Sequence, residues 1–362
     1  MSERRIPAIR RFPALGVVLA IFALAAGLSA QEKPKLVVED DCQQFAVGPN
    51  GVIAYTVPHL KRVKKVLTGR DDIWIVSSDG RKKRIVEGEK FMPLLPPTSY
   101  VVDSLRWSPD GRRLAVNMTI QTVSSEDDTS GSQGSGKAIL LLDENGGEIK
   151  VAGSEKRFIE DGFDAVWLAD GATVVYLTGQ GPYQIWGVKP SEGKPKALFE
   201  GHTFDGVVWD APRNQAFAIG KDLSLTGREV IVDLNLLKET VSEVARVGGF
   251  QGRMSVSQSG NKIGYFKDGD TIEVIDLRQP QKPVTVRVGY GRFEFGADEN
   301  HVLLKRGPVD KSGSLVWVGI ADGSFQPILH DLIFHDFEIA PGGGEVVVTD
   351  PGKRVLKVYP LS

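Results

Sequence analysis

The 362-residue sequence is poor in cysteine, in histidine and in excess charge of either sign. Its single cysteine, Cys42, cannot form an internal disulfide, so cross-links do not stabilise the fold. The 44 Lys and Arg residues nearly balance the 46 Asp and Glu residues, which argues against nucleic acid as a partner. The five histidines show none of the spacings of a zinc site, and we expect neither a metal nor a cofactor.

The motifs of common enzyme classes are also missing. The sequence has no P-loop, no Gly-x-Ser-x-Gly nucleophile elbow, and no Gly-x-Gly-x-x-Gly placed between a strand and a helix. His330 and His335 are five residues apart, but a metal site would need further ligands that this spacing does not supply. We therefore expect no catalytic residues, and the sequence favours a binding protein over an enzyme.

Long apolar runs are absent except at the N-terminus. The run from Phe12 to Leu28 follows a stretch with four arginines and ends in the small residues Ser29 and Ala30. This order is typical of a secretory signal peptide cleaved before Gln31. We predict a signal peptide over residues 1–30 and a single exported domain over 31–362, periplasmic or secreted. The alternative is an uncleaved anchor, because a bilayer needs only about 20 apolar residues.

What the sequence does contain is a repeat: a short strand, a turn rich in Pro, Asp and Gly, and a second apolar strand. Successive copies start 60, 60, 42, 47, 39 and 44 residues apart, and the shorter intervals match one four-stranded propeller blade. The seven copies are Phe45–Gly51, Leu105–Gly111, Ala165–Gly171, Val207–Arg213, Met254–Gly260, Phe293–Glu299 and Phe337–Gly343.

We therefore predict an all-β fold, a seven-bladed β-propeller of four-stranded antiparallel blades. The last copy is followed by too little chain for a complete blade. The segment Lys35–Glu39 precedes the first copy and is expected to supply the missing strand, which would close the ring and leave no free edge there. The alternative is an open β-sandwich.

Two segments resemble a known family. The segments Trp107–Val116 and Asp72–Gly80 resemble the repeat of TolB-like, WD40-like propellers and of the propeller domain in prolyl-oligopeptidase-type serine peptidases. The first copy looks especially like acylaminoacyl-peptidase-like members. The resemblance is strongest in the first two copies and implies a propeller without the hydrolase domain of those peptidases. It specifies the fold better than the function, because propellers host many unrelated activities.

Three long insertions fall on one predicted face of the propeller: Thr56–Asp71, Gly88–Asp103 and Thr122–Gly136. Loops on a rigid scaffold commonly carry binding. The first insertion is a basic amphipathic turn or strand, or a solvated charged loop; the second is apolar and proline-rich, and either presents anchors or caps the blade core; the third is expected to be disordered. The predicted partner-binding residues are His59, Lys61, Arg62, Lys64, Lys65, Phe91, Leu94, Leu95 and Tyr100.

A second candidate site lies at the mouth of the central channel, where the crossovers bring polar residues to the start of the innermost strands. Carboxylates there predict a negative ring that attracts a cation or a basic peptide. The alternative is that these aspartates make local hydrogen bonds that tie adjacent blades together. The residues are Asp103, Asp164, His202, Asp205, His335 and Asp336.

Together these features predict an exported, non-enzymatic propeller that binds a protein or peptide on its long-loop face in a bacterial-type cell envelope. We expect a monomer that contacts a membrane only if the leader is retained. The alternative is a propeller enzyme, or an accessory subunit of a peptidase, that uses the channel-mouth Asp and His residues.

Overall fold

The computed structural model describes residues 33–63, 66–91, 98–123, 133–221, 228–288, 291–307, 312–332, 336–350 and 354–361. These residues belong to one compact unit, Glu32–Ser362. The predicted signal peptide, residues 1–30, lies outside them. Among the described residues, no helix has the length and apolar character needed to cross a membrane.

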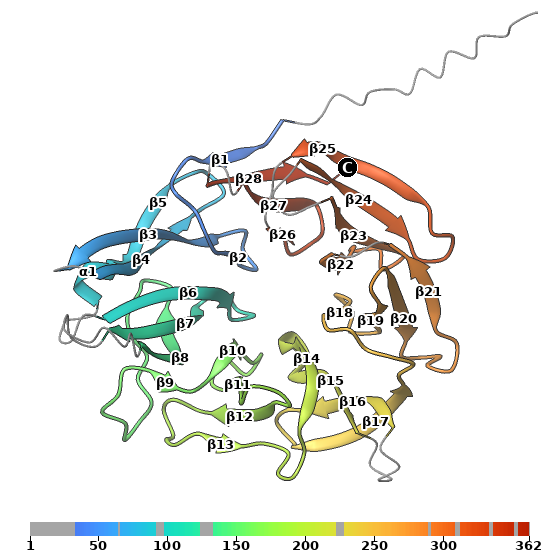
Figure 1. Cartoon of the computed structure of the whole chain (residues 1–362), viewed down its shortest axis with the longest axis horizontal. Helices are drawn as coiled ribbons and strands as arrows, with labels where there is room; N and C mark the ends of the chain where they lie inside the picture. Colours follow the sequence, from blue (N-terminus) through green and yellow to red (C-terminus); the bar gives the residue numbers. More distant parts are fainter. Residues whose placement is uncertain are drawn as a thin grey trace, which may run out of the picture. The chain divides into compact units, whose positions relative to one another are not determined.

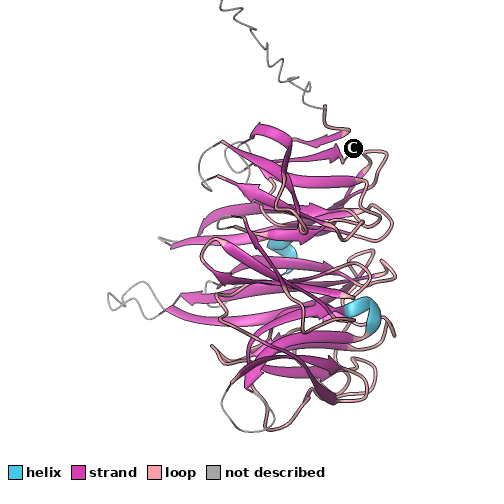
Figure 2. Cartoon of the chain, turned by 90° about the vertical axis from the view of Figure 1, so that its right-hand side faces the viewer, coloured by secondary structure: helices cyan, strands magenta, loops and turns pink. Residues whose placement is uncertain are grey.

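Antiparallel sheets surround a common axis, and strands make up most of the unit (Figures 1 and 2). Four sheets have four strands consecutive in sequence, so each is a meander. They comprise β10 (Phe163–Trp167), β11 (Val174–Thr178), β12 (Gln184–Val188) and β13 (Lys196–Ala197); β14 (Phe204–Asp210), β15 (Gln215–Lys221), β16 (Glu229–Asn235) and β17 (Thr240–Arg246); β18 (Met254–Val256), β19 (Lys262–Asp268), β20 (Thr271–Asp276) and β21 (Val284–Arg287); β22 (Phe293–Phe295), β23 (His301–Arg306), β24 (Gly313–Gly319) and β25 (Phe325–Leu332).

A fifth four-stranded sheet joins the two ends of the described chain. It contains β26 (Asp336–Ile339), β27 (Glu345–Asp350), β28 (Val355–Pro360) and the N-terminal strand β1 (Leu36–Val38). Strand β1 runs antiparallel to β28, with Leu36 opposite Val358 and Val38 opposite Leu356. The prediction that the segment before the first repeat completes the last sheet is confirmed.

The remaining sheet has eight strands and consists of two meanders. The first contains β2 (Phe45–Val47), β3 (Ile53–Val63), β4 (Val66–Val76) and β5 (Lys82–Val86); the second contains β6 (Thr98–Trp107), β7 (Arg113–Val123), β8 (Gln133–Asp143) and β9 (Ile159–Glu160). The short helix α1 (Gly88–Phe91) lies between them in sequence. A parallel pairing of Arg70 with Tyr100 links β4 to β6.

The predicted loops of the first two repeats are largely paired strands. Strands β3 and β4 pair from Ile53–Val76 to Val63–Val66, so the basic insertion is a β-hairpin, the strand alternative of the sequence prediction. Strands β7 and β8 pair to Val123–Gln133, which takes in the two ends of the third insertion; residues 124–132 lie outside the described residues.

Burial of β1 against its neighbours predicts that its inward and outward residues differ in importance. Val38 is 2% exposed and packs with Tyr55 and Leu356, whereas Val37 is 41% exposed. We expect Val38→Asp to lower the free energy of unfolding by about 3 kcal/mol or more, because it buries a charge without a partner. The matched Val37→Asp should cost less than about 1 kcal/mol. Equal losses in urea titrations of the two variants would contradict a packing role for β1.

Candidate binding site in the axial channel

A cavity of about 1090 Å³ lies where the inner strands meet around the axis. Figure 1 shows these strands, β2, β6, β14, β18, β22 and β26, converging on the centre. Their apolar residues and the prolines of the repeat turns form much of the wall, including Val47, Pro49, Pro109, Val207, Pro212, Met254, Val256, Phe295, Ile339 and Pro341.

One position of the repeat lines the cavity in most copies and supplies part of its polar wall. Successive residues of a strand point to opposite faces, so the second residue of each copy points away from the first and third. Residues from all three positions reach the cavity wall, but those at the second position do so most often. Among the described residues, six of the seven second-position residues line the cavity: Ala46, Arg106, Val208, Ser255, Glu294 and Glu338. Sequence reasoning missed these residues, although aligning the copies and marking the charged second positions would have found three of them.

An ion-pair cluster occupies one side of the wall. Arg292, just before β22, donates to Glu294 Oε1 at 2.5 Å and to Asp336 Oδ1, and its guanidinium stacks 5.4 Å from the centre of the Phe337 ring. Burial alone would lower the pKa of Arg292, but the carboxylates of Glu294, Asp336 and Glu338 together hold it above its usual value. Carboxylates of the protein itself therefore balance the positive charge of Arg292.

The two glutamates of this cluster connect neighbouring inner strands. Glu294 Oε2 accepts the backbone N–H of Ile339 at 2.9 Å, and Glu338 Oε2 accepts that of Val47 at 3.3 Å. Burial raises the pKa of Glu338 to about 7, and the charge of Glu294 adds to the shift, while Arg106, Arg292 and the Val47 N–H oppose it. These carboxylates hold β22 to β26 and β26 to β2.

The cavity wall is not the negative ring that the sequence predicted. Its ionisable residues are four basic and three acidic: Arg106, Arg253, Arg292, Lys305, Glu294, Asp336 and Glu338. Of the predicted channel-mouth residues, Asp336 lines the cavity and is bound to Arg292 and to the backbone N–H of Phe337 at 2.9 Å. The prediction of a free ring of carboxylates is therefore wrong.

Asp164 ties two adjacent sheets together, as the alternative prediction for these aspartates proposed. Its Oδ2 accepts the indole N–H of Trp209 at 2.9 Å, which links β10 to β14 of the next sheet. Burial raises its pKa, against the opposing effects of Arg106 and of the Trp209 hydrogen bond. The tie uses a side-chain donor rather than the backbone N–H that local aspartate turns supply.

The other predicted channel-mouth residues do not converge. Asp103 lies at a bulge of β6, where its carboxylate accepts from Thr119 at 2.8 Å and from Lys137 at 2.9 Å. Asp205 is exposed and His202 is half-buried, and neither lines the cavity. His335 lies outside the described residues.

The predicted partner-binding residues are only partly visible. Tyr100 is 1% exposed, and its hydroxyl donates to the Asp71 carbonyl at 2.6 Å, so it cannot present a surface anchor as predicted. His59 is exposed on β3, with Nε2 3.1 Å from Asp72 Oδ2. For the others the structure gives at most the backbone: Lys61 and Arg62 lie on β3 and Phe91 ends α1, whereas Lys64, Lys65, Leu94 and Leu95 lie outside the described residues.

Buried carboxylates at the base of these hairpins hold the eight-stranded sheet together. Asp71 Oδ2 accepts the Val102 N–H at 2.8 Å and Asp72 Oδ1 accepts the Gly88 N–H at 2.7 Å, so β4 is fixed to β6 and to α1. Burial raises the pKa of Asp71 to about 6. Both carboxylates therefore have backbone partners, which supports a structural role for this cluster.

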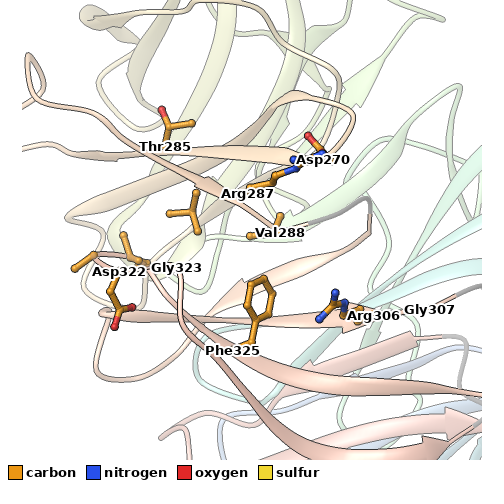
Figure 3. A pocket seen from close by; sticks show the side chains of 12 residues that line it. Asp270, Thr285, Arg287, Val288, Arg306, Gly307, Asp322, Gly323 and Phe325 are labelled. Atoms are coloured by element: carbon orange, nitrogen blue, oxygen red, sulfur yellow. The ribbon is translucent and has the colours of Figure 1, made fainter. Parts of the chain in front are cut away.

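A second hollow, of about 770 Å³, lies between β21 and the β24–β25 turn (Figure 3). Its charged groups are already occupied: Arg287 pairs with Asp270 at 2.6 Å, and the Arg306 guanidinium lies 5.0 Å from the centre of the Phe325 ring. The Arg287 and Asp270 side chains are well exposed, so this pair is worth little energetically. The axial cavity is the larger of the two and is lined by more strands.

Comparison with known proteins supports the fold alone. No known family's sequence profile and no curated protein sequence matches the chain. A solved structure, the β-propeller domain of Cps50 (Swd1) from Myceliophteria thermophila, aligns over 90% of this chain and 100% of its own length, with a TM-score of 0.56 and 13% identity. The chain is therefore an all-β propeller with four-stranded antiparallel blades, similar to a WD40-type propeller.

The raised pKa of Glu338 predicts a pH dependence of stability. Between its usual pKa of 4.5 and about 7, the folded protein holds a proton that the unfolded chain has released, so the free energy of unfolding should fall as pH rises. We expect a loss of at least about 1 kcal/mol between pH 5 and 7.5 in urea titrations. Asp71 contributes in the same direction.

Glu338→Gln is the matched variant, because the amide oxygen can still accept the Val47 N–H but does not titrate. Its loss of stability over the same pH range should be clearly smaller than that of the native protein. Identical pH slopes for the two proteins would show that Glu338 is ionised normally.

Proposed function

We propose that this chain is an exported, non-enzymatic propeller scaffold that binds an extended segment of a partner protein in its axial cavity. The observation that carries the proposal is the cavity of about 1090 Å³, whose wall is built by six inner strands and the repeat turns beside them. A wall drawn from many strands is rigid, so a ligand can bind without first ordering a loop. The TolB-like resemblance of the first two repeats is consistent with a binding role.

We further propose that the propeller has seven blades. The eight-stranded sheet consists of two four-stranded meanders joined by the bridge between Arg70 and Tyr100, and five other four-stranded sheets accompany it. Counting each meander as a blade gives one blade for each copy of the repeat. The extended hairpins of the first two blades account for the added chain length there.

The composition of the wall favours a protein segment over a small metabolite. Ligand pockets for small molecules commonly measure about 300–1,000 Å³ and enclose most of the ligand, whereas this cavity is at the upper end and open along an axis. Its wall alternates apolar residues and prolines with a few charged groups, which suits an extended chain with mixed side chains. The carboxylates expected of an enzyme here are engaged in ties between strands, which supports binding over catalysis.

The proposal predicts that filling the cavity abolishes peptide binding. A phage-displayed library of random peptides should yield binders to the native chain with micromolar affinity. Ser255→Trp places an indole on the cavity wall, and should weaken those binders at least tenfold by occupying their space. Val284→Trp is the control, because Val284 is 40% exposed on the outer strand β21 and should change affinity less than twofold.

Isothermal titration calorimetry measures both affinities, and circular dichroism checks that both variants are folded. If panning enriches no peptide, or if Ser255→Trp and Val284→Trp bind the enriched peptides equally, the axial cavity is not the binding site.

For the location of the protein, we propose that residues 1–30 direct export and are removed before Gln31, and that the mature chain acts in the cell envelope or outside the cell. The basic, apolar and small-residue parts of the leader support this. Expression of the full chain in a secreting bacterial host should give a soluble extracytoplasmic product whose intact mass matches a chain that begins at Gln31. A product that retains residues 1–30 in the membrane fraction would instead support an anchor.

A further inference from the structure

We propose that the segment bound in the axial cavity is acidic, and that the guanidinium groups of Arg106 and Arg253 bind its carboxylates. This inference rests on the proposed binding function and names the chemistry of the partner: an extended protein segment that carries two or more Asp or Glu residues.

Arg106 is placed to meet a ligand. It is the second residue of its repeat copy, between Leu105, which is fully buried, and Trp107, whose indole N–H donates to the Ala46 carbonyl at 3.2 Å. Arg106 and Trp107 both line the cavity, and the Arg106 side chain, which points away from the buried Leu105, is half-buried there. Within the described part of the chain, no hydrogen bond or ion pair engages its guanidinium.

The carboxylates near Arg106 are committed elsewhere. Asp164 accepts the indole N–H of Trp209, and Glu338 accepts the backbone N–H of Val47. Both interact with Arg106 through charge only, without a contact of ion-pair length. Arg106 is half-buried and its guanidinium has no protein partner among the described residues, so an incoming carboxylate that forms a bidentate pair would be favoured.

Comparison with the next repeat shows how the surroundings of Arg253 differ from those of Arg292. Arg253 and Arg292 each stand immediately before the first residue of a copy. Arg292 is neutralised by Glu294 two residues later and by Asp336, whereas the residue two after Arg253 is Ser255, which carries no charge. Arg253 is exposed at the cavity and has no ion pair among the described residues, so the site has a second guanidinium without a protein partner.

The distribution of charged groups on the cavity wall also favours an acidic ligand. All three acidic groups of the cavity are hydrogen-bonded within the protein: Glu294 to Ile339 and Arg292, Asp336 to Arg292 and Phe337, and Glu338 to Val47. Two of the four basic groups, Arg106 and Arg253, are not. The charges left for a ligand are therefore positive, which favours a negative segment and disfavours the basic peptide that the sequence predicted.

The test uses three fluorescein-labelled decapeptides of the same valine, proline and serine framework, which carry three glutamates, three glutamines or three lysines. Fluorescence anisotropy with the chain from Gln31 should show the glutamate peptide binding at least tenfold more tightly than the glutamine peptide, and the lysine peptide most weakly. Arg106→Gln should lower affinity for the glutamate peptide at least fivefold without changing that for the glutamine peptide. Arg106→Lys should restore part of the loss, because it keeps the charge but not the bidentate geometry.

Arg287→Gln is the matched control, since Arg287 lies on the outer strand β21 with its side chain 83% exposed. It should leave all three affinities within twofold of native. Arg253→Gln should weaken the glutamate peptide further when combined with Arg106→Gln.

The outcomes separate the two proposals. If the glutamine or lysine peptide binds as tightly as the glutamate peptide, and Ser255→Trp abolishes that binding, the cavity binds peptides but the acidic preference is wrong. If Arg106→Gln and Arg287→Gln weaken the glutamate peptide equally, its binding is a surface charge effect, and the assignment of Arg106 is overturned. If no peptide binds and panning also enriches none, the proposed function fails together with this inference.

Discussion

The structure depends on hydrogen bonds that cross from one inner strand to the next around the axis. Among the described residues, no backbone ladder joins the inner strands of neighbouring blades, so side chains must hold the crowded centre of the ring. Carboxylates, an amide and indoles do this by reaching backbone or side-chain partners in the adjacent sheet. The ties are Glu294 to Ile339, Glu338 to Val47, Trp107 to Ala46, Asn117 to Ala165, and Trp209 to Asp164. Burying a carboxylate for this purpose is costly, as the raised pKa of Glu338 shows, and is offset because each has a donor.

A second set of ties connects the repeat turns of adjacent blades. Arg113 donates to the Gly171 carbonyl, and the Asn214 side chain accepts the Ala169 N–H at 2.9 Å. Glu299 continues the series by accepting the Ser259 N–H at 2.7 Å. The turns are thus held to one another as well as to their own strands, so the mouth of the cavity is a fixed frame. Such a frame can select a ligand by shape and charge without paying the entropy of ordering loops.

The repeat was sufficient to predict an all-β fold of four-stranded antiparallel sheets and the closing role of β1, because short strands, Gly-rich turns and a fixed period are local signals. It did not predict the eight-stranded sheet or the full length of its hairpins. The site was harder to predict, for a physical reason. Whether a carboxylate is free or tied depends on a partner from another blade, as with Asp164 and Trp209, and no local signal reports that partner. Tyr100 shows the same limit: an aromatic residue beside a proline-rich segment suggested a surface anchor, but its hydroxyl meets the Asp71 carbonyl inside the sheet. Alternation within the inner strands was the signal available, and it identifies Arg106.

Folding and the proposed binding would use the same ring of residues, which differ in what each group already contacts. Substitution of Glu294, Glu338 or Arg292 would lower the stability of the protein, because it leaves their hydrogen-bond partners unsatisfied. Arg106 makes no such contact among the described residues, so its substitution should leave the ring intact while changing what the cavity accepts. Most inner residues of this propeller hold the ring together. The proposed recognition of a ligand therefore depends on the few inner residues that do not. On this proposal, a chain with near-balanced charge presents two guanidinium groups without protein partners at its axis, those of Arg106 and Arg253.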